Sequence, residues 1–239
     1  MQRLSTVFGW ADFPRPLFHG CDFALRFELG GDREMGPARF LQAMDRARFI
    51  ASLVFAGADN LTVMLPFRSR RPGAEAPSGL RKTLQAAGFS AATGATKRME
   101  PRDSDDAEDV AAGWHRFLFA FDIRNGAEQI SPLIWAAVAN EMGIKPRFPS
   151  IALNYILDLE RGVAMHIYDD RGLDLVAIKP SLLRPCYEQF NDWLAEHDRR
   201  RMTATFAFDV MNGDQGSNLQ SHGPGGVSRG SGACRAVNL

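Results

Sequence analysis

The sequence predicts an α+β domain, in which a mixed, largely antiparallel sheet carries its helices mainly on one face. Segments with two-residue hydrophobic alternation, typical of strands, are interspersed with segments of three- and four-residue spacing, typical of amphipathic helices. The two types do not alternate strictly enough for a doubly wound parallel sheet. The last three predicted strands also follow one another closely, which favours antiparallel pairing.

The first strand and the first long helix are the clearest elements. Over residues 21–31, hydrophobic and polar residues alternate and then stop at two glycines, as in a strand with one buried face. From 36 to 56 the hydrophobic spacing changes to three and four residues, with Pro37 in the first turn, so a long amphipathic helix follows. The apolar run 60–67 predicts a second strand that closes at Pro66.

The middle of the chain alternates between ordered segments and charged loops. We expect a short helix at 79–88, a strand at 114–123 and a second well-defined helix at 131–143. In the last of these, Ser131 is expected as the N-cap, and Gly143 as the stop. The stretches near 68–79 and 98–112 are predicted to be exposed loops.

The last third of the chain predicts three consecutive strands and a helix, at 151–159, 163–169, 173–179 and 180–200. These elements complete a single domain over residues 1–208. From 209 to 239 the chain is rich in glycine and serine and lacks a hydrophobic period. This segment is predicted to be a disordered tail, because it cannot bury enough apolar surface to offset the entropy of ordering.

The composition narrows the class of protein. The chain has 28 Lys and Arg residues and 28 Asp and Glu residues, so no net basic field attracts nucleic acid. Its three cysteines lie far apart without metal-site spacing, which fits a reducing compartment. No apolar window approaches the roughly 18 residues that span a bilayer. We therefore expect a soluble, cytoplasmic protein with neither a membrane nor a nucleic-acid partner.

Residues 166–177, "HIYDDRGLDLVA", concentrate polar side chains at a predicted hairpin. Asp169 suits the first position of a type I turn, and Gly172 suits the left-handed position of the bulge that follows. Residues 170–171 would then form the turn centre, with Arg171 as a solvated tip. Turn geometry alone could thus account for both aspartates, and adjacent positions make them a poor catalytic pair.

The turn also predicts how the two strands pair. The implied register joins Tyr168 to Asp174, Ile167 to Leu175 and His166 to Val176. One face of the hairpin is then entirely apolar and should lie under the helices: Val163, Met165, Ile167, Leu173, Leu175 and Ala177. His166, Tyr168 and Asp174 share the opposite face.

The strand at 21–31 adds to this polar face if it joins the same sheet. Arg26 and Glu28 are two residues apart, so they point to the same side of their strand. They could form an exposed row of cross-strand ion pairs. Alternatively, together with the hairpin's polar residues, they could form a binding face on the flat side of the sheet.

Three stretches of the chain resemble a bacterial family known as domain of unknown function 3885. They are "ALRFELGG", "RFLQAMDRARFIASLVFAGADNLTVML" and "MHIYDDRGLDLVAIKPSLLRPCYEQFNDWLAEHDR". The most specific part is the YDDRG hairpin, which is followed by a helix that contains Tyr187 and Trp193. The resemblance covers most of residues 17–200. It implies a small, soluble, cytoplasmic domain in bacteria, but neither a reaction nor catalytic residues.

The first functional hypothesis is a non-catalytic binding or interaction protein with a protein partner. By analogy alone, this partner could be a toxin that the protein neutralises. The expected binding residues are Arg26, Glu28, His166, Tyr168, Arg171 and Asp174. The sequence shows no nucleophile with an adjacent base, no metal-ligand quartet and no phosphate-binding loop. We therefore expect neither a resident metal nor a cofactor.

The second hypothesis is a hydrolase, with or without a metal. His166, Asp174 and Glu28 would act as ligands or as acid–base groups, and Arg26 would stabilise an anion. This requires the side chains to converge around one concavity. A third hypothesis, a nucleic-acid-binding module, needs a basic stripe with exposed aromatic residues, which the sequence lacks.

Overall fold

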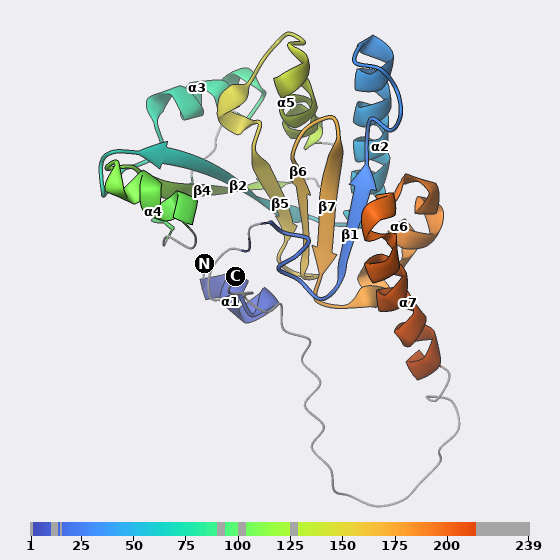
Figure 1. Ribbon diagram of the computed structural model, residues 1–239. Helices are drawn as coiled ribbons and strands as arrows, with labels where there is room; N and C mark the ends of the chain where they lie inside the picture. The colour runs from blue at the N-terminus through green and yellow to red at the C-terminus, as the bar shows by residue number, and fades with distance from the viewer. Residues whose placement is uncertain are drawn as a thin grey trace, which may run out of the picture.

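A computed structural model describes residues 2–10, 14, 16–89, 94–99, 104–124 and 129–213. Its strands form one sheet in the order β1-β7-β6-β5-β2-β4-β3 (Figure 1). They are β1 (Ala24–Glu28), β2 (Asn60–Ser69), β3 (Ala95–Arg98), β4 (His115–Arg124), β5 (Asn154–Asp158), β6 (Val163–Ile167) and β7 (Gly172–Ala177). Each described pairing is antiparallel. The α+β prediction is confirmed, with an antiparallel sheet rather than a mixed one.

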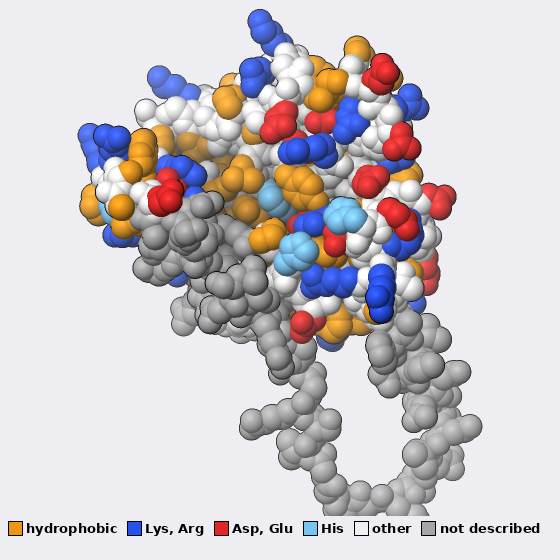
Figure 2. Space-filling model, in the orientation of Figure 1, with side chains coloured by type: hydrophobic (Ala, Val, Ile, Leu, Met, Phe, Trp, Pro, Cys, Tyr) orange, Lys and Arg blue, Asp and Glu red, His pale blue; other side chains and the backbone are white. Residues whose placement is uncertain are grey.

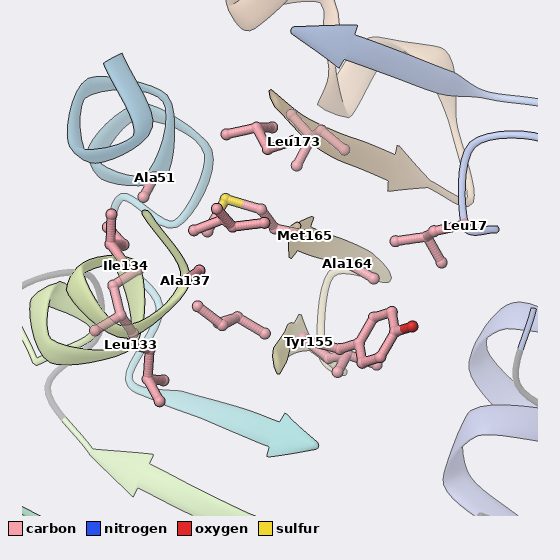
Figure 3. Packing of buried hydrophobic residues seen from close by; sticks show 14 of the residues in the cluster. Leu17, Ala51, Leu133, Ile134, Ala137, Tyr155, Ala164, Met165 and Leu173 are labelled. Atoms are coloured by element: carbon pink, nitrogen blue, oxygen red, sulfur yellow. The ribbon is translucent and has the colours of Figure 1, made fainter. Parts of the chain in front are cut away.

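The helices α2 and α5 pack on one face of this sheet. The described helices are α1 (Gln2–Phe8), α2 (Pro37–Val54), α3 (Ser78–Ala86), α4 (Ser104–Ala111), α5 (Ser131–Met142), α6 (Arg184–Gln189) and α7 (Arg199–Gly213). Short 3-10 turns are η2 (Pro149–Ile151), η3 (Pro180–Leu182), η4 (Asn191–Trp193) and η5 (Glu196–Asp198). The segment around Leu17 lies on the other face, on the side of Ala164 and Tyr155 (Figure 3).

One part of the core lies between the sheet and the α2–α5 layer, and the same cluster continues on the other face with Leu17, Ala164 and Tyr155. Met165 and Leu173 point from the hairpin toward these helices, which contribute Ala51, Ile134 and Ala137 (Figure 3). All six residues of the predicted apolar hairpin face are at most 1% exposed. The prediction of this buried face is therefore confirmed. Burial of a side chain of this size stabilises a fold by about 1.5–3 kcal/mol.

The hairpin register differs from the predicted one by two residues. His166 lies opposite Asp174, and Ile167 lies opposite Leu173. The turn is displaced by one residue toward the N-terminus, because Gly172 rather than Asp174 lies opposite Tyr168, whose backbone N–H donates to the carbonyl of Gly172 at 3.2 Å. Since side chains alternate with a period of two, the shift leaves every side chain on its predicted face.

Gly172 is required for close packing rather than for a left-handed backbone. Its φ lies outside the positive range, and a Cβ built on it would stand 2.6 Å from the carbonyl oxygen of Phe27. It would also stand 2.9 Å from Cε2 of Tyr168. The glycine therefore lets β1 and the Tyr168 ring approach β7, and its predicted role in the bulge was wrong.

Replacing Gly172 with alanine is expected to destabilise the protein by about 1–3 kcal/mol, because backbone rather than a flexible side chain opposes the new methyl group. Urea unfolding would measure the change. Gly73→Ala is a matched control, since nothing lies within 4 Å of its added Cβ. A Gly172 variant as stable as this control would contradict the close packing.

Several predicted boundaries need correction. The segment 180–200 is not one helix: it contains η3, α6, η4 and η5, and α7 begins only at its end and continues to Gly213. The predicted loop near 98–112 contains α4. The position before α5 is Ile130, without a side-chain cap, so Ser131 is not the N-cap. Residues 214–239 of the predicted tail lie outside the described residues.

Pro66 lies inside β2 rather than at its end. It can do so because β5 pairs with β2 only from Thr62 to Met64, so the strand has a free edge at Pro66. A proline, which lacks a backbone N–H, is tolerated at such an edge.

The outer edge of β1 is closed by the segment that follows α6. Phe27 forms an antiparallel bridge with Leu194, and the backbone N–H of Ala195 donates to the carbonyl of Arg26 at 2.9 Å. The backbone N–H of Arg26 donates to Sδ of Met202 at 3.1 Å. Backbone groups of this terminal strand are therefore already paired.

Candidate functional site

A row of four side chains crosses the sheet face opposite α2 and α5. Tyr155 of β5 lies opposite His166 of β6, and His166 lies opposite Asp174 of β7. Asp174 in turn lies opposite Arg26 of β1. Residues directly opposite each other in neighbouring strands share a face, so four strands build this row.

Asp174 anchors the row and is only 1% exposed. Its Oδ1 accepts hydrogen bonds from Arg26 Nε at 2.8 Å and from the Tyr168 hydroxyl at 2.9 Å. Its Oδ2 accepts from the backbone N–H of Phe18 at 3.0 Å and from Arg26 Nη2 at 3.2 Å. Both oxygens are thus engaged, and charge-assisted bonds of this kind are strong enough to fix a geometry.

The partners of Asp174 are held in single protonation states. Burial opposes the charge of Arg26, but hydrogen bonding and attraction from Asp174 prevail and raise its pKa above the ordinary value. Its Nη1 also donates to Asp198 Oδ2 at 3.0 Å, and its guanidinium lies 4.4 Å from the centre of the Phe18 ring. Burial, followed by the charge of Asp174, raises the pKa of Tyr168 above its ordinary value.

His166 differs from the other polar side chains of the row, because neither of its ring nitrogens has a hydrogen-bond partner within the described part of the chain. The side chain is 8% exposed, and its ring stacks on Tyr155 with centroids 4.2 Å apart. Burial lowers the pKa of His166 to about 4, against the opposing attraction of Asp174 and Asp169. The imidazole is therefore neutral at pH 7 and presents one donor and one acceptor, both unused.

Replacing His166 with phenylalanine is expected to raise the free energy of unfolding at pH 7 by about 1 kcal/mol. The ring stacking on Tyr155 is retained, while two buried polar atoms without partners are removed. Urea unfolding measures the gain. His197→Phe is the control and should give no gain, because this imidazole is 68% exposed and lies 2.8 Å from Asp198. A destabilised His166 variant would contradict the prediction.

The hairpin aspartates do more than form a turn. Asp169 accepts the backbone N–H of Arg171 at 2.7 Å, which confirms a turn role, and its carboxylate also pairs with the Arg171 guanidinium. Asp170 pairs with Arg39 of α2 and is 1% exposed. The reading of Asp170 as only a turn former was therefore wrong. Arg171 is 69% exposed, as expected for a hairpin tip.

These side chains surround a cavity of about 700 Å3, a size typical of ligand sites. The six predicted binding residues all line it: Arg26, Glu28, His166, Tyr168, Arg171 and Asp174. Figure 2 shows this face of the molecule, where histidine side chains lie among Lys, Arg, Asp and Glu side chains. Arg26 pairs with buried Asp174 rather than with Glu28, so the exposed row of cross-strand ion pairs considered from the sequence does not form.

Sequence reasoning missed three further cavity residues with charged or titratable side chains, Asp32, Arg39 and His197. Asp32 follows β1 after two glycines, and Arg39 lies in the first turn of α2. His197 belongs to η5, in a segment that was predicted to be a continuous helix. Tertiary contacts bring these residues together, and no local pattern in the sequence signals them.

The candidate catalytic residues line the cavity without forming a catalytic pair. His166 makes no hydrogen bond to Asp174, and the oxygens of Asp174 are engaged by other groups. Glu28 is exposed at the rim. In the part of the chain that the structure describes, no three His, Cys, Asp or Glu side chains are placed to hold a metal ion.

An antiparallel sheet with α2 and α5 on one face and a ligand-sized cavity lined by side chains of the other defines an α+β domain with a pocket built on its sheet. Within that class, the chain belongs to the family described as "Domain of unknown function (DUF3885)", whose model matches residues 1–198. The resemblance found in the sequence is thereby confirmed.

The chain is also similar to the "Uncharacterized protein YnaE" of Bacillus subtilis (strain 168). The two are 29% identical over 73 residues, which make up 29% of this chain and 34% of that relative. The matched part thus spans about a third of the relative's length. No solved structure matches the chain. Among the described helices, none is both long and apolar enough to cross a membrane.

Proposed function

We propose that the protein is a non-catalytic binding protein, and that its cavity receives a segment of a protein partner. The observation that carries the proposal is His166, whose buried ring nitrogens have no hydrogen-bond partner among the described residues. A buried polar group without a hydrogen bond costs about 1–3 kcal/mol. A bound ligand that pairs with it would recover part of this free energy.

The other polar groups of the cavity support binding rather than catalysis. An acid–base catalyst works best when its pKa is near the working pH. Burial instead moves the pKa of His166 down to about 4 and that of Tyr168 upward. The hydrogen bonds around Asp174 fix the wall in advance, which lowers the entropy lost on binding. The alternative, a hydrolase that uses His166, Asp174 and Glu28, has less support.

The rim of the cavity favours a protein as the partner. Glu28, Asp32, Arg171 and His197 are exposed there, around a buried centre. An exposed polar rim around a more buried centre is typical of protein interfaces. In this proposal the protein acts in the bacterial cytoplasm, and neutralisation of a toxin is one form that such binding could take.

The experiment is photo-crosslinking in the native host. A photoreactive phenylalanine analogue at His197 on the rim should give one crosslinked protein adduct, identified by mass spectrometry. The same analogue at Lys82, an exposed residue of α3, should not give that adduct. Absence of an adduct from His197, or the same adduct from both positions, would overturn the proposal. Circular dichroism of each variant verifies the fold.

A further inference from the structure

The arginines of the cavity wall are already neutralised. Three guanidiniums line the cavity, and each is bonded to an aspartate of the β6–β7 hairpin. The pairs are Arg26–Asp174, Arg39–Asp170 and Arg171–Asp169. Arg26 additionally contacts Asp198 at 3.0 Å. An anionic ligand would therefore compete with carboxylates that are already in place.

Two carboxylates of the rim, in contrast, make no direct ion pair with a described residue. They belong to Glu28 and Asp32, which are both exposed. Arg46 lies near enough to attract both charges, but its guanidinium donates to the backbone carbonyl of Glu28 at 2.8 Å rather than to a carboxylate. The side-chain Nε of Arg33 donates to Gln42.

The charge balance around the cavity is consequently negative. The lining residues and the carboxylates that form ion pairs with them include seven carboxylates: Glu28, Asp32, Glu141, Asp169, Asp170, Asp174 and Asp198. Three guanidiniums line the same cavity, and Arg33 and Arg46 raise the number to five among the described residues. A negative potential at a concave site attracts cations and repels phosphates and carboxylates.

His166 supplies a second, independent indication. Its buried ring lines the cavity and has an unused acceptor nitrogen. A neutral imidazole accepts a hydrogen bond from an N–H group without repelling a nearby cation. Glu28 lies on β1, two strands away from His166 on β6. Two strand spacings are roughly 10 Å, so one extended basic residue could reach both.

We propose that the cavity binds a basic peptide segment, in which an arginine or lysine side chain pairs with Glu28 and Asp32 while an N–H of the same segment donates to His166. This inference rests on the proposed function, since the protein partner supplies the segment. It adds the chemistry of that segment, which must carry positive charge.

The test uses three capped tripeptides, acetyl-Gly-Xaa-Gly-amide with Xaa as Arg, Gln or Glu, and methylguanidinium as a free cation. The 15N chemical shifts of the His166 imidazole report binding to the full-length protein at low salt. The Arg peptide should bind about fivefold more tightly than the Gln peptide, as expected for accessible ion pairs. Added salt should weaken this preference.

Matched variants locate the effect. The double variant Glu28→Gln, Asp32→Asn should lose the preference for the Arg peptide. Asp45→Asn together with Asp192→Asn should retain it, since these exposed carboxylates lie outside the cavity. Equal or tighter binding of the Glu peptide would overturn the inference, as would a preference that survives the rim substitutions or the absence of any shift with the Arg peptide.

Methylguanidinium distinguishes the source of the cation. If it binds as tightly as the Arg peptide, the site recognises a small cation and the peptide contact to His166 is excluded. Crosslinking from His197 separates this inference from the proposed function. A crosslinked partner combined with no preference for the Arg peptide would refute only the basic segment.

Discussion

Asp174→Ala is expected to lower the free energy of unfolding by about 3–5 kcal/mol. The substitution leaves the half-buried guanidinium of Arg26 with only Asp198 as a carboxylate partner, and it removes the acceptor of Tyr168 and of the Phe18 backbone. Removal of one member of a buried ion pair is among the costliest changes in a protein interior. Urea denaturation followed by circular dichroism measures the loss.

Two further variants separate charge from packing. Asp45→Ala, at an exposed position of α2, should change stability by less than about 0.5 kcal/mol. The double variant Arg26→Met, Asp174→Leu should be more stable than Asp174→Ala, because it removes the charge together with its partner. If the double variant is no more stable, the loss comes from packing and not from the stranded guanidinium.

Acidification from pH 7 to pH 4 is expected to cost about 3 kcal/mol of stability through His166 alone. Burial lowers the pKa of His166 from 6.5 to about 4 in the folded protein. Below pH 6.5 the unfolded chain therefore binds a proton that the folded protein binds only near pH 4. This loss of stability is nearly absent above pH 6.5 and grows as the pH falls toward 4.

The comparison with His166→Phe isolates this contribution. Other titrating groups are common to both proteins, so the difference between their unfolding free energies should grow by about 3 kcal/mol between pH 7 and pH 4. Urea unfolding at intervals of half a pH unit gives both curves. Parallel curves would show that His166 takes up its proton equally easily in the folded and unfolded states.

The fold could be predicted wherever an element buries one face. The alternation in β1 and the three- to four-residue spacing in α2 are direct consequences of such burial. The short polar elements β3 and α4 carry little of this signal, so they were missed. The hairpin register was missed for another reason, since the turn is held by contacts from Asp169 and Asp170 to two arginines, and no local pattern signals these contacts.

The same distinction holds for the candidate site. Side chains alternate between the two faces of a strand, and this alternation along β1, β6 and β7 was enough to place Arg26, His166 and Asp174 on one face. The alternation could not show that Asp174 would be buried and bonded to the Phe18 backbone, or that the ring nitrogens of His166 would lack partners among the described residues. These properties depend on loops that cross the sheet, which have no periodic pattern.

Because the edge of β1 is closed, a partner on this side would be recognised through side chains rather than through backbone hydrogen bonds. Leu194, Ala195 and Met202 occupy backbone groups of this strand, so another chain's strand cannot simply extend the sheet there. Extension of a sheet relies mainly on backbone hydrogen bonds that every sequence can make. A partner that approaches this side instead meets the side chains of the cavity, so selectivity would depend on the partner's own sequence.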